Sequence, residues 1–205
     1  MQMSGPFRWV YEIGNWLFKF MFLHLLWIVF TIVGLGVLGI SPATAGIFAV
    51  MQKWITEDAD APVFRTFFDT YKKEFISSNI LGLILVALAA FLYVDFIISK
   101  QMIQSFFVHI LLVILIFMYI FTLLYIFPVF VRFELKLFYY IKQSFLIALA
   151  QPLETAIMVV SVLTIYLLFS YLPLTLVFAG STLFAYPISW IALRAFQKIK
   201  EKKTT

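Results

Sequence analysis

The chain contains no cysteine, which excludes disulfides, thiolate chemistry and palmitoylation. Histidine is nearly absent: only His24 and His109 occur among 205 residues, so a multi-histidine metal site is excluded. Charged residues make up only 12% of the chain. The sequence has no P-loop, zinc-protease or serine-hydrolase motif. We therefore expect no cofactor, no metal and no catalytic residue, and we predict that the protein is not an enzyme.

One nucleotide-binding pattern occurs literally, in the stretch Gly34-Leu35-Gly36-Val37-Leu38-Gly39. A dinucleotide loop needs a strand before its G-x-G-x-x-G and a helix after it, whereas this stretch lies inside an apolar run. The glycines instead predict a close helix contact or a bend.

Hydrophobic residues dominate the sequence, at 64% of the chain. A helix crosses about 30 Å of hydrocarbon with about 20 apolar residues, and five runs reach that length or come close to it. Strands of a membrane barrel would alternate polar and apolar residues, which these runs do not. We predict an all-α, polytopic membrane protein with one integral membrane domain over residues 1–205 and five spans, near 20–40, 78–98, 106–131, 153–170 and 173–193.

Basic residues are divided unequally between the two sides of this five-span topology. Of the 15 Lys and Arg residues, all but Arg8, Lys19 and Lys100 fall on one side. Cytoplasmic segments carry the excess of basic residues, so this side, with the C-terminus, is predicted to be cytoplasmic. Basic residues next to span ends meet anionic lipid, and we therefore expect membrane lipid and no nucleic acid as a partner.

A small-x-small cleavage pattern, Ala43-Thr44-Ala45, follows the first apolar run and raises the alternative of a signal peptide. The apolar core of a signal peptide is usually about 7 to 15 residues long, and the first run is longer. The sequence therefore favours a retained first span.

The predicted cytoplasmic segment 41–77 contains two short helices. Ser41 and Pro42 are a suitable cap and first turn for the first helix, which a polar stretch at 56–60 ends. The second helix has an aromatic stripe at helical spacing, formed by Phe64, Phe67, Phe68, Tyr71 and Phe75. Two interpretations stay open: the stripe packs against the protein's own helices, or it docks on a partner or on lipid. The candidate docking or lipid-facing residues are Arg65, Phe68, Tyr71, Lys72, Lys73, Arg132 and Glu134. Arg132 and Glu134, at the end of the third span, are expected to meet lipid phosphate or to pair with the segment 41–77.

Ionisable residues at membrane depth are the remaining candidates for a site, because a charge there is costly unless it is paired or hydrated. His24, Asp95 and His109 all come near the outer ends of spans in the predicted topology. They either form one shallow site for a proton, a cation or a sugar hydroxyl, or lie separately at the membrane interface. Glu154 is expected to complement a helix N-terminus, and Pro187 predicts a kink in the fifth span.

Four segments together resemble the YesL-like family of bacterial integral membrane proteins: Asn15 to Trp27, SPATAGIFAVMQKW from Ser41, FRTFF from Phe64, and FPVFVRFE from Phe127. The resemblance covers residues 5–200. It implies a domain of unknown function, common in Gram-positive bacteria and often encoded beside carbohydrate ABC-transporter and sugar-utilisation genes. The family supplies no established catalytic residues, so the matching Pro42, Ala43, Thr44 and Ala45 indicate family identity only.

Two functional hypotheses follow from these observations. The first is a non-enzymatic accessory membrane protein associated with carbohydrate uptake or its sensing, whose partners are a carbohydrate ABC transporter, a sensor kinase or a second copy of the chain. The alternative is a small transporter or channel for a sugar or related solute. A membrane enzyme ranks third, because the sequence has no recognisable nucleophile and base pair.

Overall fold

The computed structural model describes residues 6–57, 60–103 and 106–204, and every regular element within these ranges is helical, which confirms the all-α prediction. The elements are α1 (Pro6–Val33), α2 (Val37–Thr56), α3 (Val63–Lys73), α4 (Phe75–Ile98), the π-helix η1 (Ser99–Ile103), α5 (Phe106–Arg132), α6 (Leu137–Ala150), α7 (Pro152–Tyr171) and α8 (Pro173–Thr204).

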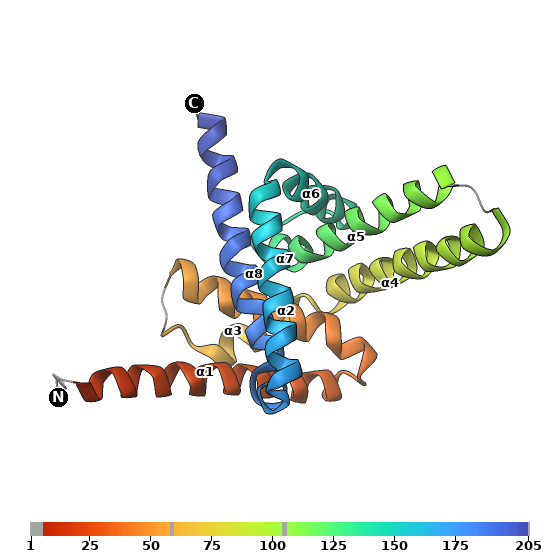
Figure 1. The fold of residues 1–205 in the computed structure, drawn as a ribbon. Helices are drawn as coiled ribbons and strands as arrows, with labels where there is room; N and C mark the ends of the chain where they lie inside the picture. Colours follow the sequence, from red (N-terminus) through yellow and green to blue (C-terminus); the bar gives the residue numbers. More distant parts are fainter. Residues whose placement is uncertain (1–5, 58–59, 104–105, 205) are drawn as a thin grey trace.

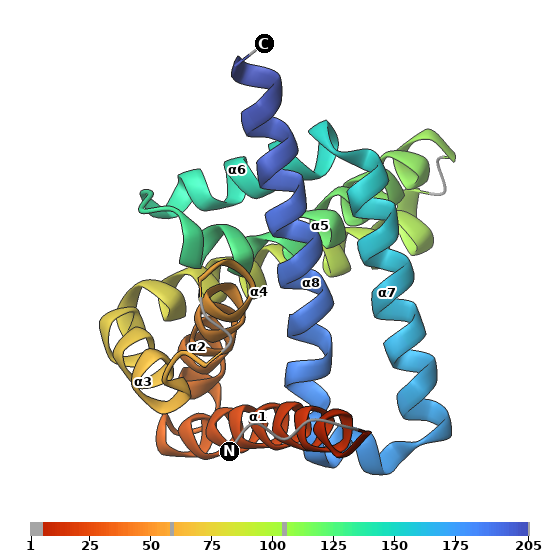
Figure 2. The ribbon, with the colours of Figure 1, turned by 90° about the vertical axis from the view of Figure 1, so that its left-hand side faces the viewer.

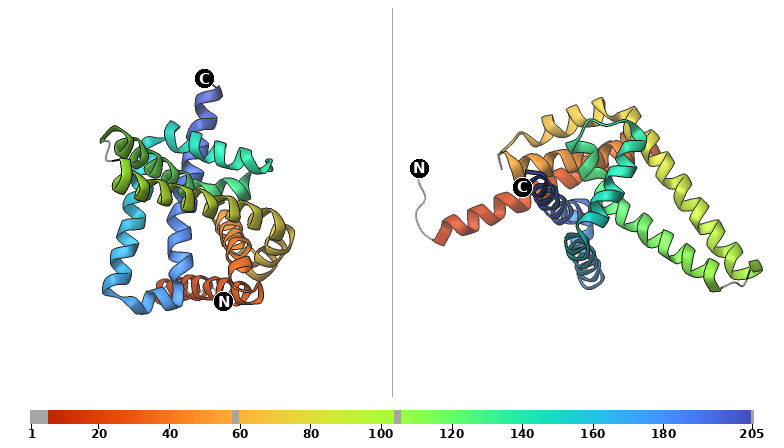
Figure 3. Two further views of the ribbon diagram at one scale, coloured as in Figure 1. Left: turned by 90° about the vertical axis from the view of Figure 1, so that its right-hand side faces the viewer. Right: turned by 90° about the horizontal axis from the view of Figure 1, so that it is seen from above.

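Among these elements, five helices are long and apolar enough to cross a membrane, as expected from the sequence. The candidate spanning segments are Tyr11–Val33, Phe75–Gln101, Phe106–Arg132, Pro152–Tyr171 and Pro173–Lys202. Figure 1 and Figure 3 show that they do not form a parallel bundle. Helices α4 and α5 make a hairpin that projects away from the other helices, and α7 and α8 run steeply to this hairpin. Only the ends of α4 and α5 nearest the body contribute to the core, through residues such as Leu81, Leu85, Tyr125 and Val129.

The predicted first span at 20–40 is wrong in its boundaries, because a turn divides that run. α1 ends at Val33, and Leu35 and Gly36 take positive φ angles of 61° and 73° before α2 begins at Val37. At Gly34 a Cβ would lie 2.4 Å from the Cα of Gly39, so the two backbones meet where neither residue has a side chain. The expectation of a glycine-dependent bend is confirmed.

The helix predicted to begin at Ser41 and Pro42 starts earlier and is longer. Gly36 supplies the left-handed turn that starts α2 at Val37, so Pro42 lies inside the helix instead of in its first turn. The predicted polar break is observed at Glu57 and Asp60; residues 58–59 lie outside the described ranges.

Helix α2 runs back along α1 and forms the centre of the protein (Figure 1). Its residue Ala43 belongs to a cluster with Leu23 and Phe67, and Ala45 belongs to a second cluster with Leu81 and Tyr125. Both alanines are fully buried, so small side chains let the neighbouring helices approach α2 on two faces. The Pro-Ala-Thr-Ala motif therefore has a packing role.

The antiparallel course of α2 also brings Lys19 and Asp60 together, with Lys19 Nζ 2.6 Å from Asp60 Oδ1. The prediction placed Lys19 and the segment 41–77 on opposite sides of the membrane. That assignment is wrong, because two charged groups in contact lie at one depth.

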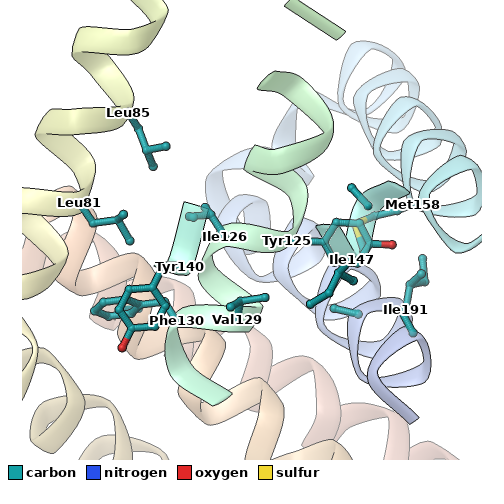
Figure 4. Packing of buried hydrophobic residues seen from close by; sticks show 14 residues of the cluster. Leu81, Leu85, Tyr125, Ile126, Val129, Phe130, Tyr140, Ile147, Met158 and Ile191 are labelled. Carbon is teal, nitrogen blue, oxygen red and sulfur yellow. The ribbon is translucent and has the colours of Figure 1, made fainter. Parts of the chain in front are cut away.

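The second cluster holds α5, α6, α7 and α8 together at the end of the α4–α5 hairpin. Figure 4 shows Tyr125 and Val129 of α5 close to Ile147 of α6, Met158 of α7 and Ile191 of α8. This packing fixes the start of the connection between α5 and α6, residues 133–136, next to the other helices.

Helix α8 passes α1 near its first residues, and its C-terminal end projects from the opposite end of the molecule (Figure 2). The helix is broken at Ala179, which has non-helical angles of φ −149° and ψ 18°. The predicted kink at Pro187 is therefore wrong in its position, since the non-helical residue lies eight positions earlier, beside the contact with α1.

Candidate functional site

The aromatic stripe of α3 surrounds one side chain of α1, Phe30. The ring of Phe30 lies 4.9 Å from that of Tyr71, 5.3 Å from that of Phe67 and 5.8 Å from that of Phe68. Tyr71 is only 8% exposed, and its hydroxyl donates to the carbonyl oxygen of Phe30 at 3.0 Å. The prediction that Tyr71 meets a partner or lipid is therefore wrong, because the protein's own first helix covers it.

The opposite face of α3 is exposed. Phe64 and Phe68 are 52% and 39% exposed, and their rings stack 5.9 Å apart. Arg65, Lys72 and Lys73 are exposed as well, and Arg65 Nε lies 3.8 Å from Asp69 Oδ2. We call Phe64, Arg65, Phe68, Asp69, Lys72, Lys73 and Glu134 the junction surface; a docking role for its predicted members stays a prediction.

An ion pair joins α3 to the extended connection between α5 and α6. Lys73 Nζ lies 3.4 Å from Glu134 Oε1 and 3.6 Å from Glu74 Oε1. For Glu134, the alternative of pairing with the segment 41–77 is therefore confirmed; for Arg132 both alternatives stay predictions. The hydrogen bond to Glu134 and the charge of Glu74 raise the pKa of Lys73 above its ordinary value, so the ammonium group is favoured.

Beside this ion pair lies a cavity of about 300 Å³ between α3, α5 and α6. Asp69, Thr70, Arg132 and Tyr140 line it together with the ion pair. Tyr140 shapes its wall, because its hydroxyl donates to the Phe133 carbonyl at 3.1 Å and accepts from the Leu135 amide at 3.0 Å. The cavity carries charges of both signs, which suits a polar protein segment better than a simple ion.

Arg132 also borders a second, larger cavity of about 440 Å³ between the C-terminal ends of α2 and α5, the middle of α6 and the C-terminal part of α8. Its polar lining consists of Thr56, Arg132, Gln143, Gln197 and Lys200, and no carboxylate is among the described residues that line it. Arg132 therefore lies on the boundary between a cavity of mixed charge and a purely basic one.

His24 lies in the contact between α1 and α8. Its Nδ1 lies 2.7 Å from Ser181 Oγ and 3.3 Å from the main-chain nitrogen of Ser181, which donates to it. The break at Ala179 places Ser181 in the first turn of the helical segment that follows, where main-chain N–H groups lack partners within the helix. The His24 ring therefore caps the second part of α8 from a neighbouring helix.

The predicted shared site of His24, Asp95 and His109 is wrong. Asp95 and His109 lie on the α4–α5 hairpin, where the His109 ring is 4.9 Å from the ring of Phe96. That hairpin projects away from the α1–α8 contact that holds His24 (Figure 1). Both residues are half-buried, and their position at the membrane interface stays a prediction.

Glu154 is the most deeply buried carboxylate in the described ranges, at 1% exposure, in the first turn of α7 as the sequence predicted. Its carboxylate faces α8: Oε1 pairs with Lys198 Nζ and lies 3.5 Å from Arg194 Nε, while Oε2 has no hydrogen-bond partner among the described residues. Neither partner was predicted from the sequence. The spacing of four residues between Arg194 and Lys198 puts both on one face of a helix, which was the available signal.

Comparison with known proteins gives the family. Residues 20–96 match the family described as "Protein of unknown function, DUF624". Two proteins of Bacillus subtilis (strain 168), each described as uncharacterized, are similar over nearly their whole length. YteU is 34% identical over 98% of this chain and 91% of its own chain. YesL is 36% identical over 92% of this chain and 90% of its own chain. The chain belongs to the YesL-like family. A third relative from the same organism, uncharacterized protein YesV, is 38% identical over 88% of both chains. No solved structure matches.

The YesL-like region matched by the family description contains α2 and α3, hence the Pro-Ala-Thr-Ala motif and most of the junction surface. Arg132 and Glu134 lie beyond that region, in the part covered by the similarity to whole relatives. The match to the family description therefore covers only part of the residues that line the two cavities. Among the described residues, no group of three His, Asp or Glu side chains could hold a metal ion.

Proposed function

We propose that this YesL-like protein is a non-enzymatic accessory membrane protein that binds a carbohydrate-uptake or carbohydrate-sensing complex through the junction surface. One observation supports docking there: the exposed, stacked rings of Phe64 and Phe68 adjoin the exposed charges of Arg65, Lys72 and Lys73. Aromatic residues and arginine are enriched at the centres of protein interfaces. The carbohydrate partner rests on the gene neighbourhood that the family resemblance implies.

In this proposal the junction surface and the C-terminus are cytoplasmic, in a bacterial cell membrane. The distribution of Lys and Arg supports this orientation. The contact between Lys19 and Asp60 supports it further, because it moves Lys19 to the basic side.

A cross-linking experiment tests the proposal, and the absence of native cysteine makes it direct. A single cysteine replaces Lys72 on the junction surface and carries a photo-crosslinker; the matched control replaces Lys142, an exposed lysine of α6. Captured proteins are identified by mass spectrometry from membranes of the native host. We expect the Lys72 position, and not the Lys142 position, to capture an ABC permease, its ATPase or a sensor kinase.

Charge reversal provides the second arm of this experiment. Reversing Arg65, Lys72 and Lys73 together should reduce capture from a cross-linker placed at Thr70, which lines the neighbouring cavity, while the protein stays abundant and membrane-inserted. Capture of only lipid and a second copy of the chain, at normal abundance, would contradict the accessory function and support a homodimer.

The break in α8 favours a second candidate function, a small transporter or channel for a sugar or related solute. Interrupted membrane helices commonly line solute sites in transporters, and Ala179 interrupts α8 beside His24 and Ser181. Substitution of His24 should then change solute flux in proteoliposomes, while His109 substitution should not. Unchanged flux in both variants, or no flux in the unaltered protein, argues against transport.

A further inference from the structure

The second cavity combines basic, amide and apolar groups from four helices that are distant in sequence. Thr56 ends α2, Arg132 ends α5, Gln143 lies on α6, and Gln197 and Lys200 lie on α8. Its volume of about 440 Å³ is in the range of small-molecule sites, which usually measure about 300 to 1,000 Å³. The cavity is therefore large enough for a headgroup-sized ligand.

The charge of the cavity lining points to an anion. Arg132 and Lys200 both border it, and the described lining includes no carboxylate. In the part of the chain that the structure describes, Arg132 has no carboxylate oxygen within ion-pair distance, although its neighbour Lys73 has two such partners. The nearby carboxylate Glu154 is already paired with Arg194 and Lys198. The amides of Gln143 and Gln197 add neutral hydrogen-bond donors.

The remaining wall of the cavity is apolar. It is formed by Phe133, Ile147, Leu193, Phe196 and Ile199. Arg132 and Lys200 lie toward the ends of the spanning segments Phe106–Arg132 and Pro173–Lys202, where a bilayer presents its phosphate groups. A guanidinium group binds phosphate oxygens in pairs, while the apolar wall suits a glycerol backbone or the start of an acyl chain.

We propose that this cavity binds a phosphate-ester anion, held by Arg132 and Lys200 and oriented by Gln143 and Gln197. The chemistry fits the headgroup of an anionic phospholipid such as phosphatidylglycerol, and also a soluble glycerol phosphate. The site shares no residue with the junction surface, although Arg132 also borders the cavity beside that surface, and it does not depend on the function proposed there.

Native mass spectrometry of the full-length protein in a neutral detergent tests the site. The delipidated protein is titrated with phosphatidylglycerol, with phosphatidylcholine of the same acyl chains, and with sn-glycerol 3-phosphate. The variants are Arg132→Gln and Lys200→Gln, and the matched control is Lys142→Gln, which removes an exposed lysine charge outside the cavity. We expect preferential binding of phosphatidylglycerol over phosphatidylcholine, weakened about tenfold or more by Arg132→Gln and left unchanged by the control.

Gln143→Glu separates binding from folding. It places a carboxylate beside Arg132 and Lys200, so it should abolish anion binding while leaving the unfolding midpoint unchanged or higher. Binding of glycerol phosphate with the same dependence on Arg132 and Lys200 supports the site and assigns a soluble source; binding of the lipid alone assigns the membrane. Three results would overturn the proposal. They are equal binding of the two lipids, an equal loss of binding in Arg132→Gln and Lys142→Gln, and undiminished anion binding by Gln143→Glu.

Discussion

The hydroxyl of Tyr71 donates to the main-chain carbonyl of Phe30 at 3.0 Å and so ties α3 to the last turn of α1, 41 residues earlier. The same carbonyl accepts the amide hydrogen of Gly34, also at 3.0 Å. Both bonds form where the chain leaves the first span and turns into α2. Helix α3, which was a candidate for external docking, thus stabilises the turn from α1 into the central helix α2.

Tyr71→Phe removes this hydrogen bond and keeps the ring that contacts Phe30. We expect a loss of about 1 kcal/mol in the free energy of unfolding, the typical net contribution of one hydrogen bond. Thermal or denaturant unfolding in detergent micelles measures it. The control is Tyr139→Phe, which removes the hydroxyl of an exposed tyrosine on α6 and should change stability little. Equal effects of the two variants would show that the bond to Phe30 contributes nothing.

The same hydroxyl gives a pH dependence. Burial raises the pKa of Tyr71 above its ordinary value of 10.0, so the folded state holds this proton more tightly than the unfolded state does. The stabilisation is complete below the unfolded pKa and is lost as the pH rises through the folded pKa.

Unfolding midpoints of the unaltered protein and of Tyr71→Phe, measured from about pH 8 to pH 11.5, check this direction. The difference between the two proteins should shrink above pH 10, because the tyrosinate cannot donate to the Phe30 carbonyl. The raised pKa of Lys73 affects both proteins alike, so its contribution cancels in the comparison. A difference that is constant or grows with pH would contradict the prediction.

The number of helices long and apolar enough to span a membrane could be predicted from the sequence, but the turn between α1 and α2 could not. Gly34, Leu35 and Gly36 are apolar or small, so the hydropathy of the run does not fall where the backbone turns. Only the positive φ angles and the contact with Gly39 distinguish this turn from a continuous helix.

The candidate site was predictable to a similar extent. Helical spacing identified the aromatic stripe of α3, because periodicity is local. It could not show that Phe30 covers Tyr71 and leaves Phe68 partly exposed, since that depends on how α3 meets α1. Glu154 and Lys198 are 44 residues apart, and no local pattern in the sequence pairs them.

Gly34→Ala should disrupt the turn between α1 and α2. The added Cβ would lie 2.4 Å from the Cα of Gly39 and 2.6 Å from the hydroxyl oxygen of Tyr71, so the two backbones must separate. Overpacking of this kind costs about 1 to 3 kcal/mol, and the loss of the Tyr71 bond adds to it. Unfolding in detergent micelles measures the change.

Gly14→Ala is the matched control for this substitution. Gly14 lies in α1 with nothing within 4 Å of the position of an added Cβ, so the variant should be neutral or more stable because alanine favours helix. A loss of stability at position 14 as large as that at position 34 would show that the contact with Gly39 is not the cause.

Glu154→Gln tests the buried ion pairs between α7 and α8. The substitution keeps the volume of the side chain and removes the charge that faces Lys198 and Arg194. Removing one partner of a fully buried pair costs about 3 to 5 kcal/mol, but the two basic side chains are 37% and 48% exposed and can be hydrated, so we expect about 2 kcal/mol.

The control for this substitution is Glu134→Gln, whose side chain is 95% exposed and whose pairing with Lys73 should contribute about 0.5 kcal/mol or less. Lys198→Met combined with Glu154→Gln should be less destabilised than the sum of the single variants, because each removes the same interaction. Strict additivity would show that the two side chains do not stabilise each other.

His24→Leu should loosen α8 at its break and, through the break, the first part of the helix. The imidazole Nδ1 accepts from the main-chain N–H of Ser181, and leucine leaves that group without this partner at the break, at a cost of about 1 to 3 kcal/mol. A spin label at Leu174, an exposed residue before the break, should become more mobile, whereas a label at Lys200 should not change. His109→Leu is the control, since its ring contacts Phe96 on the separate hairpin and should leave both labels unaffected. Equal mobility at Leu174 in His24→Leu and the unaltered protein would show that helix packing alone holds the first part of α8.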